Sequence, residues 1–115
     1  MTNIMNINGY KAVITYDHEI KLFRGEFVNL NGGADFYADT VEGLEKEALL
    51  SLHTFLDVCK EKGIEPNVKK SGKFVLRLPS DIHEKATLIA KASGKSLNEW
   101  ATQVLDNAIK SKLPA

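Results

Sequence analysis

The chain has 115 residues, of which 43% are hydrophobic and 26% are charged, and its formal net charge is zero. This composition is typical of a soluble globular protein and leaves room for one domain or two small ones. It excludes a membrane span, because no apolar run approaches the roughly 20 residues that a bilayer requires, and no secretion-signal pattern is present. We therefore expect a cytoplasmic protein.

The charges are divided unevenly along the chain. Residues 1–68 carry 6 Lys or Arg against 11 Asp or Glu, a net charge of −5, whereas residues 69–115 carry 9 against 4, a net charge of +5. A nucleic-acid-binding module joined to an acidic module of another function would show this asymmetry. The basic half is thus the candidate for contact with DNA or RNA.

The acidic half begins with the pattern of a small antiparallel sheet. Residues 1–9 are polar and rich in Asn, so we expect them to be irregular. The segment 10–17 alternates, with Tyr10, Ala12, Ile14 and Tyr16 on one face, and this period of two predicts a strand.

Two further strands are predicted after a polar turn at His18-Glu19. The first lies within residues 20–30 and is centred on 22–28, and the second covers 34–38, beyond an Asn- and Gly-rich loop. Short connections between the three strands predict an antiparallel meander.

A long helix follows the predicted sheet. Asp39 or Thr40 is expected to cap it, with Asp39 and Glu42 spaced as a capping box. Gly63 followed by Pro66 marks its end. One side is apolar and would cover a face of the sheet; it contains Val41, Leu44, Ala48, Leu52, Phe55, Leu56 and Cys59.

The basic half opens with a short alternating segment, Lys73–Leu78. A strand here would place Phe74, Leu76 and Leu78 on one face and Lys73, Val75 and Arg77 on the other. The chain offers this strand no neighbouring strand in the same stretch. We therefore expect it to pair antiparallel with the same strand of a second copy.

Two short amphipathic helices complete this half. Pro79 ends the strand and suits a first helical turn, with Ser80 or Asp81 as cap and Asp81 and Glu84 spaced as a capping box. The first helix would bury Ile82, Ala86, Leu88, Ile89 and Ala92 and end at Ser93-Gly94.

The second helix begins at Ser96, which forms a full S-x-x-E capping box with Glu99. Its inward face would contain Leu97, Trp100, Ala101, Val104, Leu105 and Ala108. The pair is too small to bury enough apolar area alone against the backbone entropy of about 1–2 kcal/mol per residue.

The order of K-F-V-L-R-L-P, a helix, and a G-K-S-L-N-E turn resembles the ribbon-helix-helix (Arc/MetJ-type) DNA-binding domains over roughly forty residues. The resemblance implies a homodimer whose two-stranded ribbon enters the major groove of operator DNA. Lys73, Val75 and Arg77 would face the bases, and Phe74, Leu76, Leu78 and Trp100 would form the dimer core.

The same resemblance implies a phosphate anchor at the start of the second helix. Ser96, Leu97 and Asn98 match the residues whose amides meet a backbone phosphate in the field of the helix dipole. Lys95 adds a positive charge beside them.

The β-β-β-α order of the acidic half, with G-E-F-V-N-L-N-G-G-A-D-F-Y-A-D-T and C-K-E-K-G-I-E-P, resembles the N-terminal domain of HicB-type antitoxins, a partial RNase H-like fold. The resemblance implies an α+β chain with this domain over 1–66, a linker over 67–71 and the ribbon-helix-helix domain over 72–115. It implies a non-enzymatic antitoxin that silences a HicA-type mRNA-cleaving toxin and represses its own operon, as a dimer, or a tetramer if the N-terminal domains also pair.

Two alternatives stay open. A free-standing repressor would use the N-terminal domain for ligand sensing or oligomerisation. A metal-dependent RNase H-like nuclease would need converging carboxylates, for which Asp17, Glu19, Glu26, Asp35 and Asp39 are the candidates, with Asp17 and Glu26 as the most plausible pair. The histidines and the single Cys59 have no spacing that supports nucleophilic catalysis or a metal site, so neither metal nor cofactor is expected.

Overall fold

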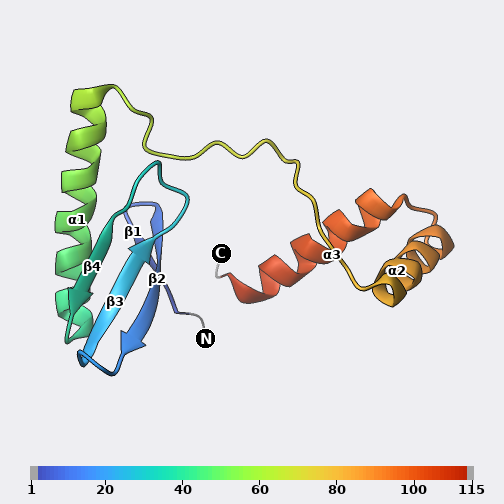
Figure 1. Cartoon of the computed structure of the whole chain (residues 1–115), viewed down its shortest axis with the longest axis horizontal. Coiled ribbons are helices and arrows are strands. Elements are labelled where there is room, and N and C mark those ends of the chain that lie inside the picture. Colours follow the sequence, from blue (N-terminus) through green and yellow to red (C-terminus); the bar gives the residue numbers. More distant parts are fainter. Residues whose placement is uncertain (1–2, 114–115) are drawn as a thin grey trace. The chain divides into compact units, whose positions relative to one another are not determined.

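The computed structural model describes residues 3–113 and has an α+β architecture (Figure 1). Within these residues the elements are β1 (Ile4–Ile7), β2 (Tyr10–Asp17), β3 (Leu22–Phe27), β4 (Asp35–Ala38), α1 (Val41–Lys62), α2 (Ser80–Ala92) and α3 (Leu97–Lys112). Contacts between residues divide the chain into an N-terminal unit, Asn3–Ser71, and a C-terminal unit that begins at Gly72.

The strands of the N-terminal unit form an antiparallel sheet in the order β1-β2-β3-β4. The hairpin between β2 and β3 pairs Asp17 with Leu22 across the predicted polar turn, and β4 pairs with β3 through Gly25 and Phe36. The three predicted strands and their meander connections are therefore confirmed. The finer resemblance to an RNase H-like fold stays a prediction.

The prediction of an irregular start was wrong for the described part of residues 1–9. Ile4–Ile7 forms a fourth strand, β1, which pairs with β2 from Ile4 opposite Val13 to Ile7 opposite Tyr10. Asn8 and Gly9 form the two-residue connection and both have positive φ, 52° and 89°. An Asn-Gly pair between two strands is the strongest short-range hairpin signal, because both residues tolerate this backbone.

Helix α1 covers one face of the sheet and closes a core without help from the rest of the chain (Figure 1). Leu44, Ala48 and Leu52 pack against Ala12 of β2 and Phe36 of β4. The predicted apolar side of α1 is confirmed except at its first residue, because Val41 is exposed. The Thr40 side chain caps the helix by accepting from the Gly43 N–H at 2.9 Å, and Gly63 ends it in the left-handed conformation.

One position in the sheet requires glycine for packing. A Cβ atom on Gly25 of β3 would lie 2.0 Å from the ring of Phe36, its partner on β4. The Phe36 ring is buried and stacks in a tilted arrangement on Phe27, with ring centroids 5.3 Å apart. The missing side chain of Gly25 therefore makes the space that the core aromatic residue fills.

The chain leaves the N-terminal unit along the loop that joins β3 and β4. The Val68 N–H donates to the Asn29 carbonyl and the Asn31 N–H donates to the Pro66 carbonyl, at 2.9 and 2.8 Å. The Asn31 side chain also donates to the carbonyls of Glu65 and Asn67. Residues 65–68 are therefore held against the N-terminal unit by hydrogen bonds. The predicted domain boundaries stay a prediction.

The C-terminal unit consists of an extended segment and the helices α2 and α3. Gly94 has a φ of 70°, so it supplies the left-handed turn that the sequence predicts between the helices. The Ser96 capping box of α3 is confirmed in both directions. The predicted cap of α2 was wrong, because this helix already starts at Ser80, its N-cap is Pro79, and no side chain caps it.

Candidate nucleic-acid interface and partner surfaces

An apolar groove runs between α2 and α3 of the C-terminal unit and has a volume of about 740 Å³. Both helices and the segment before them contribute to it. Its walls are formed by Leu76, Leu78, Ile82, His83, Lys85, Ala86, Ile89, Leu97, Asn98, Trp100, Ala101, Val104 and Leu105. Most of the inward faces predicted for the helices therefore meet. Leu88, Ala92 and Ala108 are the exceptions, because all three are exposed and lie outside the groove.

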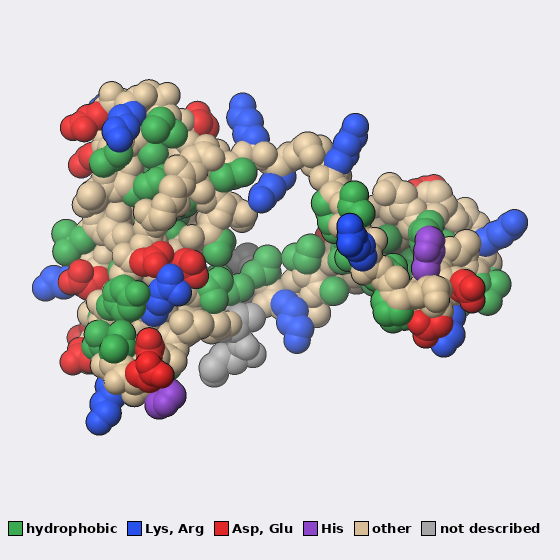
Figure 2. Space-filling view, viewed as in Figure 1, with side chains coloured by type: hydrophobic (Ala, Val, Ile, Leu, Met, Phe, Trp, Pro, Cys, Tyr) green, Lys and Arg blue, Asp and Glu red, His purple; other side chains and the backbone are tan. Residues whose placement is uncertain are grey.

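These helices bury very little within one chain. Ala86 and Ala90 are the only buried residues described in the C-terminal unit, and α3 has none. Large apolar side chains such as Ile89, Val104 and Leu105 are instead exposed. Figure 2 shows hydrophobic side chains on the surface of this unit. A helix pair with an open apolar groove of this size is typical of a surface that binds another protein chain.

The predicted reading strand is extended but is not part of a sheet in the single chain. Residues 73–79 have no strand assignment, and the exposed fractions of Phe74 and Val75 are 73% and 88%. Leu76 and Leu78 of the predicted dimer face already contact the groove, as does Trp100, whereas Phe74 does not line it. Lys73 and Arg77 are exposed, as base-reading side chains must be.

The predicted phosphate anchor lies at the start of α3. The Glu99 N–H donates to Ser96 Oγ at 3.0 Å, and the Ser96 N–H donates to Glu99 Oε1 at 3.3 Å. Lys95, which precedes α3, donates to the side chain of Gln103 within that helix. Lys95, Ser96, Leu97 and Asn98 are consecutive at this helix start, and their role as a phosphate anchor stays a prediction. The Glu99 contact follows the predicted capping box, whereas the contact of Lys95 with Gln103 was not predicted.

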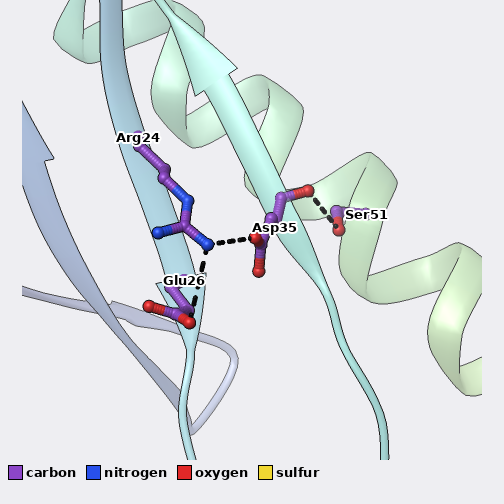
Figure 3. A network of polar contacts seen from close by, with 4 residues as sticks. All are labelled: Arg24, Glu26, Asp35 and Ser51. Atoms are coloured by element: carbon purple, nitrogen blue, oxygen red, sulfur yellow. Dashed lines mark hydrogen bonds and ion pairs between the residues drawn. The ribbon is translucent and has the colours of Figure 1, made fainter. Parts of the chain in front are cut away.

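An ionic network occupies the face of the sheet opposite α1 (Figure 3). Arg24 of β3 donates to Asp35 of β4 at 2.6 Å and lies 3.6 Å from the carboxylate of Glu26. The hydrogen bond to Asp35, reinforced by the charges of Asp35 and Glu26, raises the pKa of Arg24 above its ordinary value. Ser51 of α1 donates to the main-chain carbonyl of Asp35 at 3.2 Å, so the network joins the sheet edge to the helix.

Two of the five carboxylates considered for a nuclease, Glu26 and Asp35, belong to this ionic network. Glu26 and Asp35 neutralise Arg24 instead of facing each other across a metal position. The pairing of Asp17 with Glu26 that the nuclease alternative would use does not form. Glu26 lies opposite Val13, which is four residues, or about 13 Å, from Asp17 along β2. Among residues 3–113, no three His, Cys, Asp or Glu side chains form a group that could hold a metal ion.

A second groove lies beside the edge strand β4 and has a volume of about 650 Å³. Tyr37 of β4 and Leu50 and Val58 of α1 are exposed along it. Sequence reasoning missed this surface, although Leu50 and Val58 fall outside the apolar side predicted for α1 and could have indicated it.

For the described part of the chain, no helix combines the length and the apolarity that crossing a bilayer demands.

Comparison with known proteins gives one match. A family model described as the HicB family matches residues 55–105, which run from the second half of α1 to Leu105 in α3. Neither a curated protein nor a solved structure matches the chain. The match supports a HicB-type relationship, and such a relationship suggests a role connected with toxin-antitoxin systems.

Proposed function

We propose that the chain is a HicB-type antitoxin and autorepressor. Its C-terminal unit dimerises and binds operator DNA, and its N-terminal unit binds a HicA-type mRNA-cleaving toxin. The observation that carries this proposal is the HicB match over residues 55–105, because this stretch includes the groove, the candidate reading segment and the start of α3 together.

Dimerisation follows from the exposed apolar surface of the C-terminal unit. Two copies of Lys73–Leu78 pair antiparallel about a two-fold axis, so that Phe74 and Leu76 of each chain face the helices of both. The groove between α2 and α3 supplies the apolar surface that this pairing covers. The arrangement gives the strand the hydrogen-bonding partner that one chain does not provide.

DNA binding uses the opposite face of the paired strands. Arg77 and Lys73 of both chains lie in one major groove, where Arg77 donates two hydrogen bonds to a guanine edge and Val75 contacts a thymine methyl group. The two helix starts at Ser96 then hold the flanking phosphates. The two-fold axis of the dimer implies a palindromic operator.

Toxin binding is assigned to the N-terminal unit because this unit is complete without the helices that bind DNA. Its core is closed by α1, and residues 1–68 carry a net charge of −5. An acidic surface suits a small basic partner, and proteins that act on RNA are commonly basic. The toxin would therefore bind without competing for the reading strand.

The test is co-purification of the tagged full-length chain from its native cell, with identification of the bound protein and DNA. We expect a stoichiometric small basic protein whose free form cleaves RNA, together with DNA from upstream of the gene. A Phe74→Ala variant provides the matched control, since it should lose the DNA and keep the toxin. DNA without such a protein would instead favour a free-standing repressor, and RNA cleavage by the purified chain itself would favour a nuclease.

A further inference from the structure

Strand β4 forms an edge of the N-terminal sheet, and among residues 3–113 no strand pairs with its outer side. The Phe27 N–H donates to the Ala34 carbonyl at 3.2 Å, so these two residues are a hydrogen-bonded pair that continues the β3–β4 register. Hydrogen-bonded and non-hydrogen-bonded pairs alternate along an antiparallel ladder. The main-chain N–H and C=O groups of Asp35 and Tyr37 therefore point away from β3, toward the open edge.

Helix α1 already uses one of these outward groups. The Ser51 hydroxyl donates to the Asp35 carbonyl at 3.2 Å, which agrees with the outward direction of that carbonyl. An added antiparallel strand would therefore be held mainly by Tyr37, because a hydrogen-bonded pair exchanges both of its main-chain bonds. An open sheet edge of this kind is a template for the addition of an extended segment.

The groove beside β4 provides an apolar surface on which an added strand would pack. Helix α1 runs along this edge (Figure 1), and Leu50, Thr54 and Val58 line the groove at helical spacing. Leu50 and Val58 are both exposed in the single chain. Every second side chain of an extended segment points to the same face, so its apolar residues would cover these two while its other residues lie beside Tyr37.

The charges around the groove favour a basic occupant. Asp35 and Glu47 line it, and among residues 3–113 no Lys or Arg does. Asp35 is paired with Arg24, so Glu47 is the carboxylate that the groove offers to a cation. A second copy would bring another Glu47 and the net charge of −5 of its own residues 1–68, and like charges repel. A segment that combines apolar residues with Lys or Arg is therefore the better match.

We propose that the open edge of β4 and the groove beside it accept an extended basic segment of the toxin as a fifth strand of the sheet. The inference rests on the proposed function and names the surface of the N-terminal unit that the toxin uses. Main-chain bonds to Tyr37 provide the alignment, Leu50 and Val58 provide the apolar contact, and Glu47 favours a cationic segment.

The experiment compares Leu50→Arg with Leu49→Arg in the full-length chain. Leu50 lines the groove, whereas Leu49 is the neighbouring exposed residue of α1 and lies outside it, so both variants add the same charge to the same helix. The binding partner is the small basic RNA-cleaving protein that co-purifies with the native chain, and its affinity is measured by biolayer interferometry. Leu50→Arg should bind it roughly tenfold more weakly or worse, and Leu49→Arg should match the native chain.

Two further measurements separate charge and strand pairing from apolar contact. Glu47→Gln should weaken binding roughly twofold to threefold at low salt and less at high salt, whereas Glu45→Gln, outside the groove on the same helix, should have no effect. Amide hydrogen exchange followed by NMR should show the Tyr37 N–H exchanging at least roughly tenfold more slowly in the complex. The Phe36 N–H, which faces β3, should slow much less.

The possible failures are distinguishable. Equal affinity of Leu50→Arg and the native chain, with both folded by circular dichroism, would overturn this inference and leave the proposed function intact, as would unchanged exchange of the Tyr37 N–H in the complex. A native chain that brings down no small basic RNA-cleaving protein would overturn the toxin-binding function and this inference with it. A change in oligomeric state of Leu50→Arg alone, seen by sedimentation without the partner, would assign the groove to a second copy and would also overturn the inference.

Discussion

The N-terminal and C-terminal units use similar amphipathic patterns but differ in where their apolar side chains end up. In the N-terminal unit, α1 places Leu44 and Leu52 against the sheet, and both are fully buried within one chain. In the C-terminal unit, the apolar faces of α2 and α3 meet over an open groove, and Ala86 and Ala90 are the only buried residues described there.

This difference separates a core that one chain completes from an apolar surface that one chain leaves open. Burial of apolar area is the main favourable term in folding, and it must offset the entropy of ordering the backbone. The N-terminal unit meets this condition by itself. The C-terminal unit leaves its groove open in one chain, and the proposed dimer would cover it. Under that proposal the two units should respond differently to mutation and to protein concentration.

The largest expected effect comes from Phe74→Ala. If two chains cover the groove as proposed, each loses a buried aromatic ring worth about 3–5 kcal/mol, and the dimer dissociates. Sedimentation equilibrium measures this loss. Val75→Ala is the matched control on the opposite face of the same segment and should stay dimeric; dimerisation of Phe74→Ala at native concentrations would mean that the two faces of the strand are assigned the wrong way round.

Leu52→Ala tests the unit that one chain completes. The Leu52 side chain is 1% exposed, so its removal should leave a cavity in the core and lower the free energy of unfolding by about 2–5 kcal/mol. Leu50→Ala, a residue of the same helix that is 59% exposed, should change it by less than about 0.5 kcal/mol. Urea unfolding at several protein concentrations measures both, and a similar cost for the two variants would contradict the core described for this unit.

Gly25→Ala should produce the next largest effect in the same unit. The added methyl group overlaps the buried Phe36 ring and should cost about 1–3 kcal/mol of stability. A second substitution, Phe36→Leu, removes the ring and should recover part of that cost in a double-mutant cycle. Thermal unfolding provides the measurement, and additive effects of the two changes would disprove the proposed contact.

The smallest effects should distinguish base contacts from phosphate contacts within the C-terminal unit. Arg77→Ala should weaken binding to the operator by about 1–3 kcal/mol and relax the preference at one base pair. Lys95→Ala should instead weaken all sequences alike and reduce the slope of affinity against salt by about one unit. Salt titrations with operator and mixed-sequence duplexes make this comparison, and identical behaviour of the two variants would remove the basis for the assignment.

Local signals in the sequence are sufficient for most of the N-terminal fold. Alternation predicts β2 and β3, and the Thr40 and Gly63 caps mark both ends of α1. The missed strand β1 is four residues long, but the Asn8-Gly9 pair beside it is a hairpin signal in its own right. The polar, Asn-rich composition suggested an irregular start, because composition does not take into account that adjacent Asn and Gly favour a tight hairpin turn.

Other features depend on registers and partners that the sequence does not encode locally. The contact between Arg24 and Asp35 requires the pairing of β3 with β4, and the same pairing separates Asp17 from Glu26. Leu88 fits an apolar stripe by spacing but lies outside the groove, because the position of α3 decides which side of α2 is covered. The proposed pairing of the segment 73–78 would require a second chain and therefore stays a prediction.

The strand order β1-β2-β3-β4 means that every strand pairs with its neighbour in the sequence, and α1 follows directly. Contacts between neighbouring segments form quickly, and an N-terminal domain can fold while the remaining chain is still being synthesised. This unit can therefore be finished before α2 and α3 leave the ribosome. Covering the groove with a second copy, as proposed, is by contrast a collision between two finished chains, so its rate depends on how many copies the cell contains.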